Sequence, residues 1–205
     1  MVAIIDYDAG NIKSVEKAIQ FLGEEAIITR NPDEILNASH VILPGVGAFG
    51  DAMEKLQNYG LIPVVWEVVK REIPFLGICL GLQLLFEKSE ETPGVEGLGI
   101  LKGEIKRIPD KADLKIPHIG WNSLKFSNKG RLYEGLAENS YVYFVHSYYL
   151  EAKEEIVVAE TEYGVNIHAS VEKGNVFACQ FHPEKSSSVG LKILENFLKI
   201  SKEDR

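Results

Sequence analysis

Short apolar runs alternate with segments of helical period through the first two-thirds of the chain, and no other feature restricts the possible folds so strongly. The expected strands are Val2–Asp6, Ala26–Thr29, His40–Leu43 and Pro74–Ile78. The expected helices are Asn11–Leu22, a helix that begins after the cap Asn31, Asp51–Asn58 and Ile62–Lys70. Because parallel strands need crossover connections, such alternation is typical of a parallel sheet covered by helices. The sequence therefore predicts an α/β fold.

From about Ile100 onward the pattern changes to shorter strands separated by Gly, Asn and charged turns. The expected strands are Ile100–Ile108, Tyr141–His146, Ile156–Glu160, Asn166–Val171 and Val176–Phe181. A last helix is expected at Leu191–Ile200. No internal repeat, low-complexity tract or linker divides the chain, and 205 residues suit one compact domain. We therefore expect residues 1–205 to form a single domain whose sheet has a mixed extension.

Charge and cysteine content exclude several classes of protein. The 22 basic and 30 acidic residues leave a net charge of -8, so no basic field for a nucleic-acid backbone is expected. No apolar stretch approaches the roughly 20 residues of a membrane-spanning helix, and Met1 leads directly into an apolar run without a secretion-signal pattern. We expect a cytoplasmic protein without membrane contact. The two cysteines, Cys79 and Cys179, lack CxxC spacing, which argues against a disulfide or a metal site.

An apolar strand, a Gly-x-Cys-x-Gly turn and an apolar helix follow one another within Pro74–Phe86. The two glycines relieve crowding in a sharp strand-to-helix turn, which exposes the side chain of Cys79 at the carboxyl edge of the sheet. The helix that begins beneath the sulfur favours the thiolate, and the free backbone N–H of Leu80 can face an oxyanion. A buried structural cysteine is the alternative, but strand, glycines and helix in register predict a nucleophile.

A cysteine nucleophile needs a base, and the candidates are His40, His118, His146, His168 and His182. His40 and His168 lie in apolar strands and are interpreted as structural or surface histidines, whereas His118 and His146 stay open as candidates. His182 ends the last expected strand, and in an extended segment Glu184 lies on the same side of the chain. Glu184 can then fix the tautomer of His182. The same alternation turns Cys179 to the opposite face, as a small buried side chain.

The blocks Gly77–Gln83 and Phe181–Glu184 together resemble the signature pair of the triad, or class I, glutamine amidotransferase family. The chain is most similar to the group within that family that serves as glutaminase subunits of imidazole glycerol phosphate synthases. The blocks that carry this resemblance are Asp6–Asn11, Pro44–Phe49, Pro117–Asn122, Tyr143–Tyr148 and His182–Ser187. The resemblance implies a three-layer, mixed but largely parallel, flavodoxin-like sheet with flanking helices and a nucleophile elbow.

The same resemblance implies a mechanism without a cofactor. Cys79 attacks the side-chain amide of L-glutamine, His182 protonates the departing ammonia, Glu184 orients His182, and water releases glutamate. The ammonia passes to a separate cyclase subunit, which makes imidazole glycerol phosphate and an aminoimidazole carboxamide ribotide in histidine biosynthesis. The implied oxyanion donors are the backbone amides of Val46 and Leu80. The implied glutamine-binding residues are Gly45, Gly47, Gln83, Ser147 and Tyr148, and the implied interface residues are Asn11, Tyr143 and Lys185.

Three other functions stay open from the residues themselves. The first is a glutaminase that serves a different synthase, because the triad does not encode the ammonia acceptor. The second is a cysteine hydrolase or peptidase built on a similar elbow. The third is a silent binding module, which the presence of nucleophile, base and carboxylate disfavours. The loop Pro44–Gly50 could equally be a plain glycine-rich connection, and only the resemblance assigns it to an oxyanion.

Overall fold

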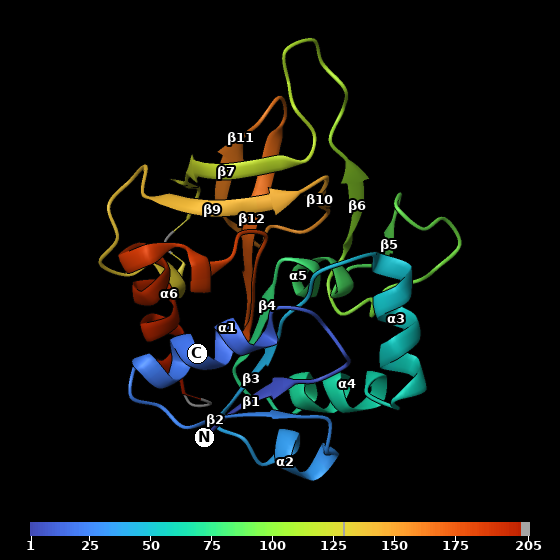
Figure 1. Ribbon diagram of the computed structural model, residues 1–205, viewed down its shortest axis with the longest axis vertical. Helices are drawn as coiled ribbons and strands as arrows, with labels where there is room; N and C mark the ends of the chain where they lie inside the picture. The colour runs from blue at the N-terminus through green and yellow to red at the C-terminus, as the bar shows by residue number, and fades with distance from the viewer. Residues whose placement is uncertain (129, 202–205) are drawn as a thin grey trace.

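The central sheet of the computed structural model has eight strands within the described residues, 1–128 and 130–201, in the order β2-β1-β3-β4-β13-β12-β11-β8 (Figure 1). The strands are β1 (Val2–Ile5), β2 (Ala26–Thr29), β3 (His40–Leu43), β4 (Phe75–Ile78), β8 (Lys125–Phe126), β11 (Val157–Glu162), β12 (Asn166–Lys173) and β13 (Val176–Cys179). Neighbours from β2 to β13 pair in parallel, and the last three strands are antiparallel. The parallel order is that of flavodoxin-like folds. The predicted α/β class and mixed sheet are confirmed.

Helices cover both faces of this sheet, which gives three layers. They are α1 (Ile12–Phe21), α2 (Pro32–Leu36), α3 (Phe49–Asn58), α4 (Ile62–Lys70), α5 (Leu80–Leu84) and α6 (Ser187–Lys199), with two 3-10 helices, η1 (Arg131–Tyr133) and η2 (Pro183–Lys185). Val2 and Ile4 of β1 share a core cluster with α1 and α6, whereas Ala3 and Ile5 share one with α2, α3 and α4. Because successive side chains of a strand point to opposite faces, β1 is buried on both.

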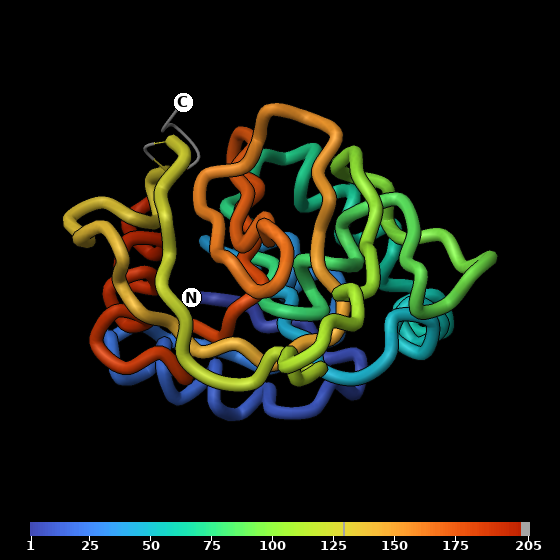
Figure 2. Tube along the Cα trace, turned by 90° about the horizontal axis from the view of Figure 1, so that it is seen from above, coloured from blue at the N-terminus to red at the C-terminus, as the bar shows by residue number. Residues whose placement is uncertain are grey.

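Two smaller sheets lie beyond the carboxyl ends of the parallel strands (Figures 1 and 2). One pairs β7 (His118–Ser123) with β9 (Tyr141–His146), and the other joins β10 (Tyr148–Ala152), β6 (Gly103–Arg107) and β5 (Lys88–Ser89). The backbone of β9 crosses the end of β13, because the amide of His182 donates to the carbonyl of Tyr143 at 2.9 Å. These sheets therefore form a roof over the edge where the chemistry is expected.

Several element boundaries differ from the predicted ones. Helix α3 begins at Phe49 rather than Asp51, because the amide of Phe49 donates to the Glu91 carboxylate at 2.7 Å, a cap from a distant loop. Helix α6 begins at Ser187 rather than Leu191, and β13 ends at Cys179 rather than Phe181. Strands β5, β7, β8 and β10 were not predicted. In the described part of the chain no helix is both long and apolar enough to cross a membrane.

Candidate active site

Three neighbouring parallel strands end at the same edge of the sheet and deliver the residues of the site. Strand β3 runs into the loop of residues 44–48, β4 into Cys79, and β13 into Gln180 and His182. In open α/β sheets ligands bind in the crevice outside these carboxyl ends. The strand order therefore brings together segments that lie far apart in the sequence.

Cys79 occupies a strained turn between β4 and α5. Its backbone has φ 54° and ψ -109°, in a region that L residues rarely adopt. The turn is close-packed: a Cβ on Gly81 would overlap the carbonyl oxygen of Leu43, and one on Gly77 would lie 2.8 Å from the carbonyl oxygen of Gly81. The amide of Cys79 donates to the carbonyl of Cys179 on β13 at 2.8 Å. This geometry is that of a nucleophile elbow.

The backbone amide of Leu80 is not free, in contrast to the prediction. It donates to the carbonyl of Gly45 at 3.3 Å. Helix α5 has only 5 residues, so its dipole can add little to the stability of a thiolate. The loop of residues 44–47 therefore closes over the amide that was expected to face an oxyanion.

His182 and Glu184 form a buried pair, but not through an extended strand as predicted. Nδ1 of His182 and Oε1 of Glu184 are 2.8 Å apart, and the two side chains are 2% and 1% exposed. Pro183 begins the 3-10 helix η2, which folds Glu184 back onto the imidazole. The hydroxyl of the buried Ser186 donates to the carbonyl of His182 at 2.6 Å and accepts the amide of Tyr143 at 2.9 Å. The pair is thus tied to β9.

The electrostatics of this pair favour a charged imidazole. Burial by itself lowers the pKa of His182, but the interactions with Cys79 and Glu184 outweigh burial and raise it. A protonated imidazole at this position can give up a proton during a reaction at the neighbouring cysteine. Asn11 donates to the same Oε1 of Glu184 at 3.1 Å, which fixes the carboxylate from the other side.

A cavity of about 300 Å³ opens in front of the sulfur. Its lining residues are Val46, Gly47, Cys79, Leu80, Gln83, Glu91, Pro117, Val145, His146, Ser147 and Tyr148. The predicted glutamine-binding residues lie in this lining, except Gly45, whose carbonyl contacts the Leu80 amide. Four lining residues were not predicted to be there, namely Glu91, Pro117, Val145 and His146. Both polar and apolar side chains line the cavity, which suits a small amphipathic ligand.

Tyr7 is a further residue of the site that the sequence analysis missed. Its hydroxyl donates to the carbonyl of Pro44 at 2.8 Å, and a Cβ on Gly45 would overlap that hydroxyl. Burial, and to a lesser extent Cys79, raises the pKa of Tyr7, so the phenol stays a donor. Gly47 has φ 103°, which favours glycine. Tyr7 therefore anchors one end of a loop whose other end can change its backbone conformation.

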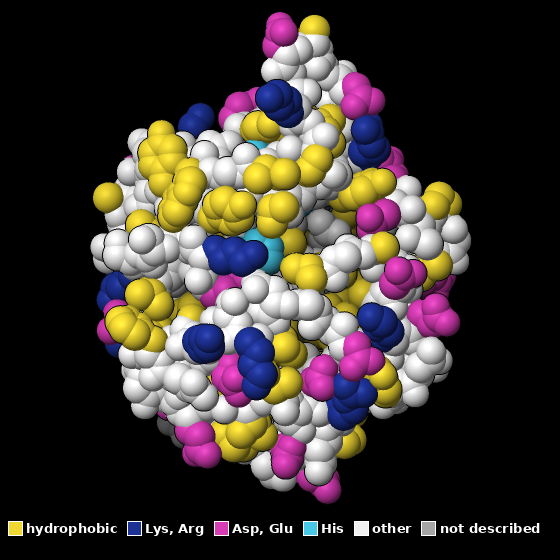
Figure 3. Space-filling view, viewed as in Figure 1, with side chains coloured by type: hydrophobic (Ala, Val, Ile, Leu, Met, Phe, Trp, Pro, Cys, Tyr) yellow, Lys and Arg dark blue, Asp and Glu magenta, His cyan; other side chains and the backbone are white. Residues whose placement is uncertain are grey.

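The three predicted interface residues lie around the mouth of the site. Asn11 and Lys185 are exposed, and Tyr143 is half-buried on β9, with its ring 6.1 Å from that of Trp121. Large apolar side chains on this face are unusually exposed: Ile119 is 60%, Trp121 52% and Tyr141 58% exposed. Figure 3 shows hydrophobic side chains gathered over β7 and β9. An exposed apolar patch of this kind marks an interaction surface.

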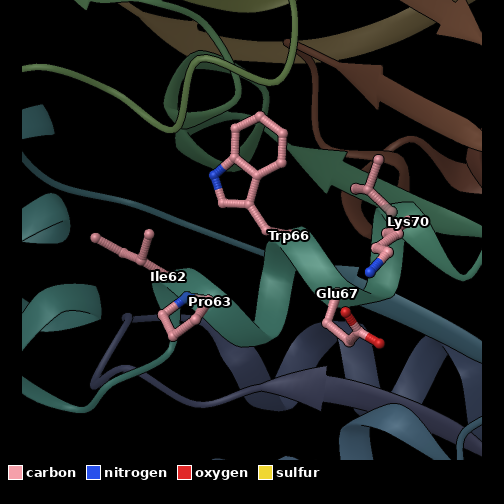
Figure 4. Close-up of a pocket in the computed structure, with 6 residues that line it drawn as sticks. Ile62, Pro63, Trp66, Glu67 and Lys70 are labelled. Carbon is pink, nitrogen blue, oxygen red and sulfur yellow. The ribbon is translucent and has the colours of Figure 1, made fainter.

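A second hollow lies along α4 and is lined by Ile62, Pro63, Trp66, Glu67, Val69 and Lys70 (Figure 4). It contains no cysteine or histidine and lies on a single helix, so it offers no catalytic constellation. Among the described residues, no group of three or more His, Cys, Asp or Glu side chains is arranged to hold a metal ion.

The chain matches the family described as "Glutamine amidotransferase class-I" over residues 3–200. It is 52% identical over 197 residues to the "Imidazole glycerol phosphate synthase subunit HisH" of Bacillus cereus strain G9842, covering 96% of this chain and 93% of that protein. It is 50% identical over 200 residues to the protein of the same name from Methanocaldococcus jannaschii, covering 98% and 100%.

Solved structures agree in fold. One described as "Crystal structure of glutamine amidotransferase" has a TM-score of 0.75 at 22% identity, covering 96% of this chain and 99% of that one. The "Structure of PurLQS from Thermotoga maritima" has a TM-score of 0.74 at 21% identity, with 96% of each chain covered. At these identities the likeness concerns the fold alone.

Proposed function

The chain belongs to the class I glutamine amidotransferase family, and from this premise we propose that it acts as the glutaminase subunit of an imidazole glycerol phosphate synthase. It hydrolyses L-glutamine to glutamate and ammonia, and a cyclase subunit consumes the ammonia in histidine biosynthesis. The observation that carries the proposal is that the Cys79 elbow and the His182–Glu184 pair meet at one edge of the sheet, with Nδ1 of His182 2.8 Å from Oε1 of Glu184. The identity of about half of all positions to subunits of that synthase supports the choice of partner.

The reaction begins with the Cys79 thiolate, which attacks the amide carbon of glutamine. The imidazolium of His182 gives its proton to the departing ammonia, and the neutral imidazole then takes a proton from the water that cleaves the thioester. Glu184 holds the imidazole through Nδ1, so that Nε2 is the atom left to exchange protons. No cofactor takes part in these steps.

The oxyanion would be held by the backbone amides of Leu80 and Val46 after a change in the loop of residues 44–47. The carbonyl of Gly45 accepts the hydrogen bond of the Leu80 amide, so this bond must break before the amide can donate to an oxyanion. One such donor lowers the barrier by about 2.7 to 4 kcal/mol. A subunit with this contact closed is therefore a slow glutaminase, and a partner that opens it accelerates the reaction.

The bound glutamine would lie in the cavity against Gly47, Ser147 and Tyr148. Gln83 lines the same cavity, but its amide nitrogen already donates to the carbonyl of Tyr148 at 3.2 Å and to Gln180 at 3.1 Å. Gln83 therefore has only its carbonyl oxygen to offer, and that oxygen accepts from the ammonium group of the substrate.

The cyclase subunit would dock on the exposed apolar face of β7 and β9. This face adjoins Asn11, Tyr143 and Lys185 at the mouth of the site, so ammonia would leave toward the partner. We also propose that residues 1–205 form a single domain, which is supported by a family match that spans residues 3–200. A cytoplasmic location stays a prediction of the sequence.

The test is reconstitution with a purified cyclase subunit. We expect the tagged chain to retain that subunit and to support formation of imidazole glycerol phosphate from glutamine. Glutamine-dependent synthesis should be lost when the chain is omitted, whereas synthesis from added ammonium should persist. Retention of a chorismate-using enzyme instead, without glutamine-dependent cyclisation, would identify a glutaminase that serves another synthase.

A further inference from the structure

A chain of hydrogen bonds leads from the sulfur of Cys79 into the protein, away from His182. The side-chain amide of Gln180, which is fully buried, donates to Sγ of Cys79 at 3.7 Å. The carbonyl oxygen of Gln180 accepts from the amide nitrogen of Gln83 at 3.1 Å. That nitrogen also donates to the backbone carbonyl of Tyr148 at 3.2 Å. Gln180 therefore touches the reacting atom on a side that the triad leaves open.

The same Tyr148 carbonyl receives a second line of donors. Nδ1 of His146 lies 2.8 Å from it, and Nε2 of His146 lies 3.0 Å from Nδ1 of His118. Nε2 of His118 in turn lies 3.4 Å from the amide nitrogen of Asn122. Asn122 belongs to β7 and lies, like His118, on the side of the strand opposite to the exposed Ile119 and Trp121, so the line runs from β7 to the wall of the cavity.

The direction of every hydrogen bond follows from one fact: a backbone carbonyl can only accept. His146 must therefore carry its proton on Nδ1, and a neutral His146 accepts at Nε2 from Nδ1–H of His118. By the same reasoning the nitrogen of Gln83 is its donor toward the Tyr148 carbonyl. The oxygen of Gln180 then faces Gln83, and its N–H groups face the sulfur.

The two histidines are held neutral and rigid. His118 stacks on Tyr163 with ring centroids 3.8 Å apart and on Phe144 at 4.8 Å. Burial lowers the pKa of His118 to about 4 and that of His146 to about 3. Both imidazoles are therefore neutral near pH 7, as the order of donors requires.

We propose that Gln180 is a catalytic residue that donates a hydrogen bond to the Cys79 thiolate, and that His146 and His118 are positioning residues that keep its amide correctly turned. A hydrogen bond to the charged form lowers the pKa of a thiol and holds the sulfur in place for attack. This inference rests on the proposed function, because it assigns further parts to the same site.

The first experiment measures the pH dependence of iodoacetamide alkylation of Cys79, by peptide mass spectrometry on the full chain. Gln180→Met keeps the length of the side chain but removes the donor. Since a hydrogen bond to a charged group contributes more than one to a neutral group, we expect the midpoint to rise by about one pH unit and alkylation at pH 7 to slow about tenfold. Gln57→Met, at an exposed position on α3, is the matched control and should leave the midpoint unchanged.

A midpoint in Gln180→Met equal to that of the unaltered chain would overturn the role of Gln180. This readout does not require glutamine turnover. If the unaltered chain with its cyclase hydrolyses no glutamine, the proposed function fails, whereas the alkylation result still decides the role of Gln180.

The second experiment separates the positioning role of His146 from a purely structural one. The side-chain nitrogen of Asn can take the place of Nδ1, so His146→Asn keeps the donor to the Tyr148 carbonyl, and His146→Leu removes it. We expect His146→Leu to slow alkylation of Cys79 about threefold and His146→Asn to restore the rate. His168→Leu, on β12, is the control for loss of a half-buried histidine.

Nitrogen-15 NMR reports the tautomers of the two imidazole rings, which do not depend on the overall stability of the fold. At pH 7 the spectra should show both His118 and His146 as neutral rings that carry their proton on Nδ1. Nε2–H tautomers at either ring, or equal alkylation rates in His146→Leu and the unaltered chain, would overturn the positioning role.

Discussion

The parallel half of the molecule and its antiparallel roof contribute different things to the site. The parallel half, β1 to β4 with its helices, supplies the nucleophile on a strained and close-packed turn. The roof encloses the nucleophile with His146 and the cavity wall at Ser147, and Tyr143 of its strand β9 is hydrogen-bonded to His182 and to Ser186 beside Glu184. His182 and Glu184 follow β13, which pairs with β4 on one side and with β12 on the other.

The site needs both regions because each holds its groups in place in a different way. The elbow holds Cys79 in a close-packed turn, where Gly81 lies so near the carbonyl of Leu43 that a Cβ would overlap it. The roof holds its groups by hydrogen bonds, among them those of Tyr143 with His182 and Ser186. A partner docked on β7 and β9 would contact the roof, and through the cavity that the roof shares with Val46 and Gly47 it would act on the loop of residues 44–47 while Cys79 stays in place.

Removing the nucleophile should have the largest effect. We expect Cys79→Ala to reduce glutamine-dependent synthesis by about 10⁴-fold or more, because no other atom can form the thioester. Ammonia-dependent synthesis by the partner should persist, since the fold is retained. Cys179→Ala removes the other buried cysteine, on β13, and should keep most of the activity. Full glutamine turnover by Cys79→Ala would contradict the assigned mechanism.

Changing the orienting carboxylate should cost less. Glu184→Gln keeps the shape of the side chain but removes the charge that supports His182 and alters the hydrogen bond at Nδ1. We expect turnover to fall by about 10² to 10⁴-fold, less than in Cys79→Ala, because no reacting atom is lost. Steady-state glutamate release by both variants in the complex measures the difference. Equal losses would mean that the two residues do not have separate roles.

Acid should loosen the roof before the parallel half. The folded-state pKa values of His118 and His146, about 4 and about 3, lie below the unfolded value of about 6.5. Their contribution to stability is therefore complete above pH 6.5 and is lost as pH falls, because the unfolded chain binds protons first. Between pH 6.5 and 5 we expect a loss of about 2 to 4 kcal/mol in the free energy of unfolding.

Hydrogen exchange at pH 5 distinguishes the two regions. Amides of β7 and β9 should lose protection while those of β1 and β3 keep it. A variant that carries both His118→Asn and His146→Asn should lose most of this acid dependence. Uniform loss of protection across both regions would contradict a roof that is the more labile part.

The parallel half could be predicted from the sequence almost element by element. Strands Ala26–Thr29 and His40–Leu43 and helix Ile62–Lys70 have the predicted bounds, because each is a local run with its own start and stop signals. Cys79 was recognisable for the same reason: strand, glycines and helix lie within a few residues of it.

The roof could be predicted only in part, because its order comes from partners distant in the sequence. Strand β7 forms by pairing with β9 and carries no strong period of its own. Glu184 reaches His182 through a 3-10 turn, so the predicted pairing is present but the predicted extended backbone is wrong. No motif marked Gln180 or Tyr7 as part of the site. For Gln180, the available signal was a polar residue near the end of an otherwise apolar strand.

The most direct test of a glutaminase gated by its partner is glutamate release measured in three states: the isolated chain, its complex with the cyclase, and the complex with the acceptor nucleotide bound. Ammonia released without an acceptor is lost to solvent, so a closed contact between Gly45 and Leu80 keeps the isolated subunit slow. We predict low activity alone and a rise of several orders of magnitude in the liganded complex, of which one oxyanion donor accounts for about 10² to 10³. Comparable rates in all three states would contradict the account.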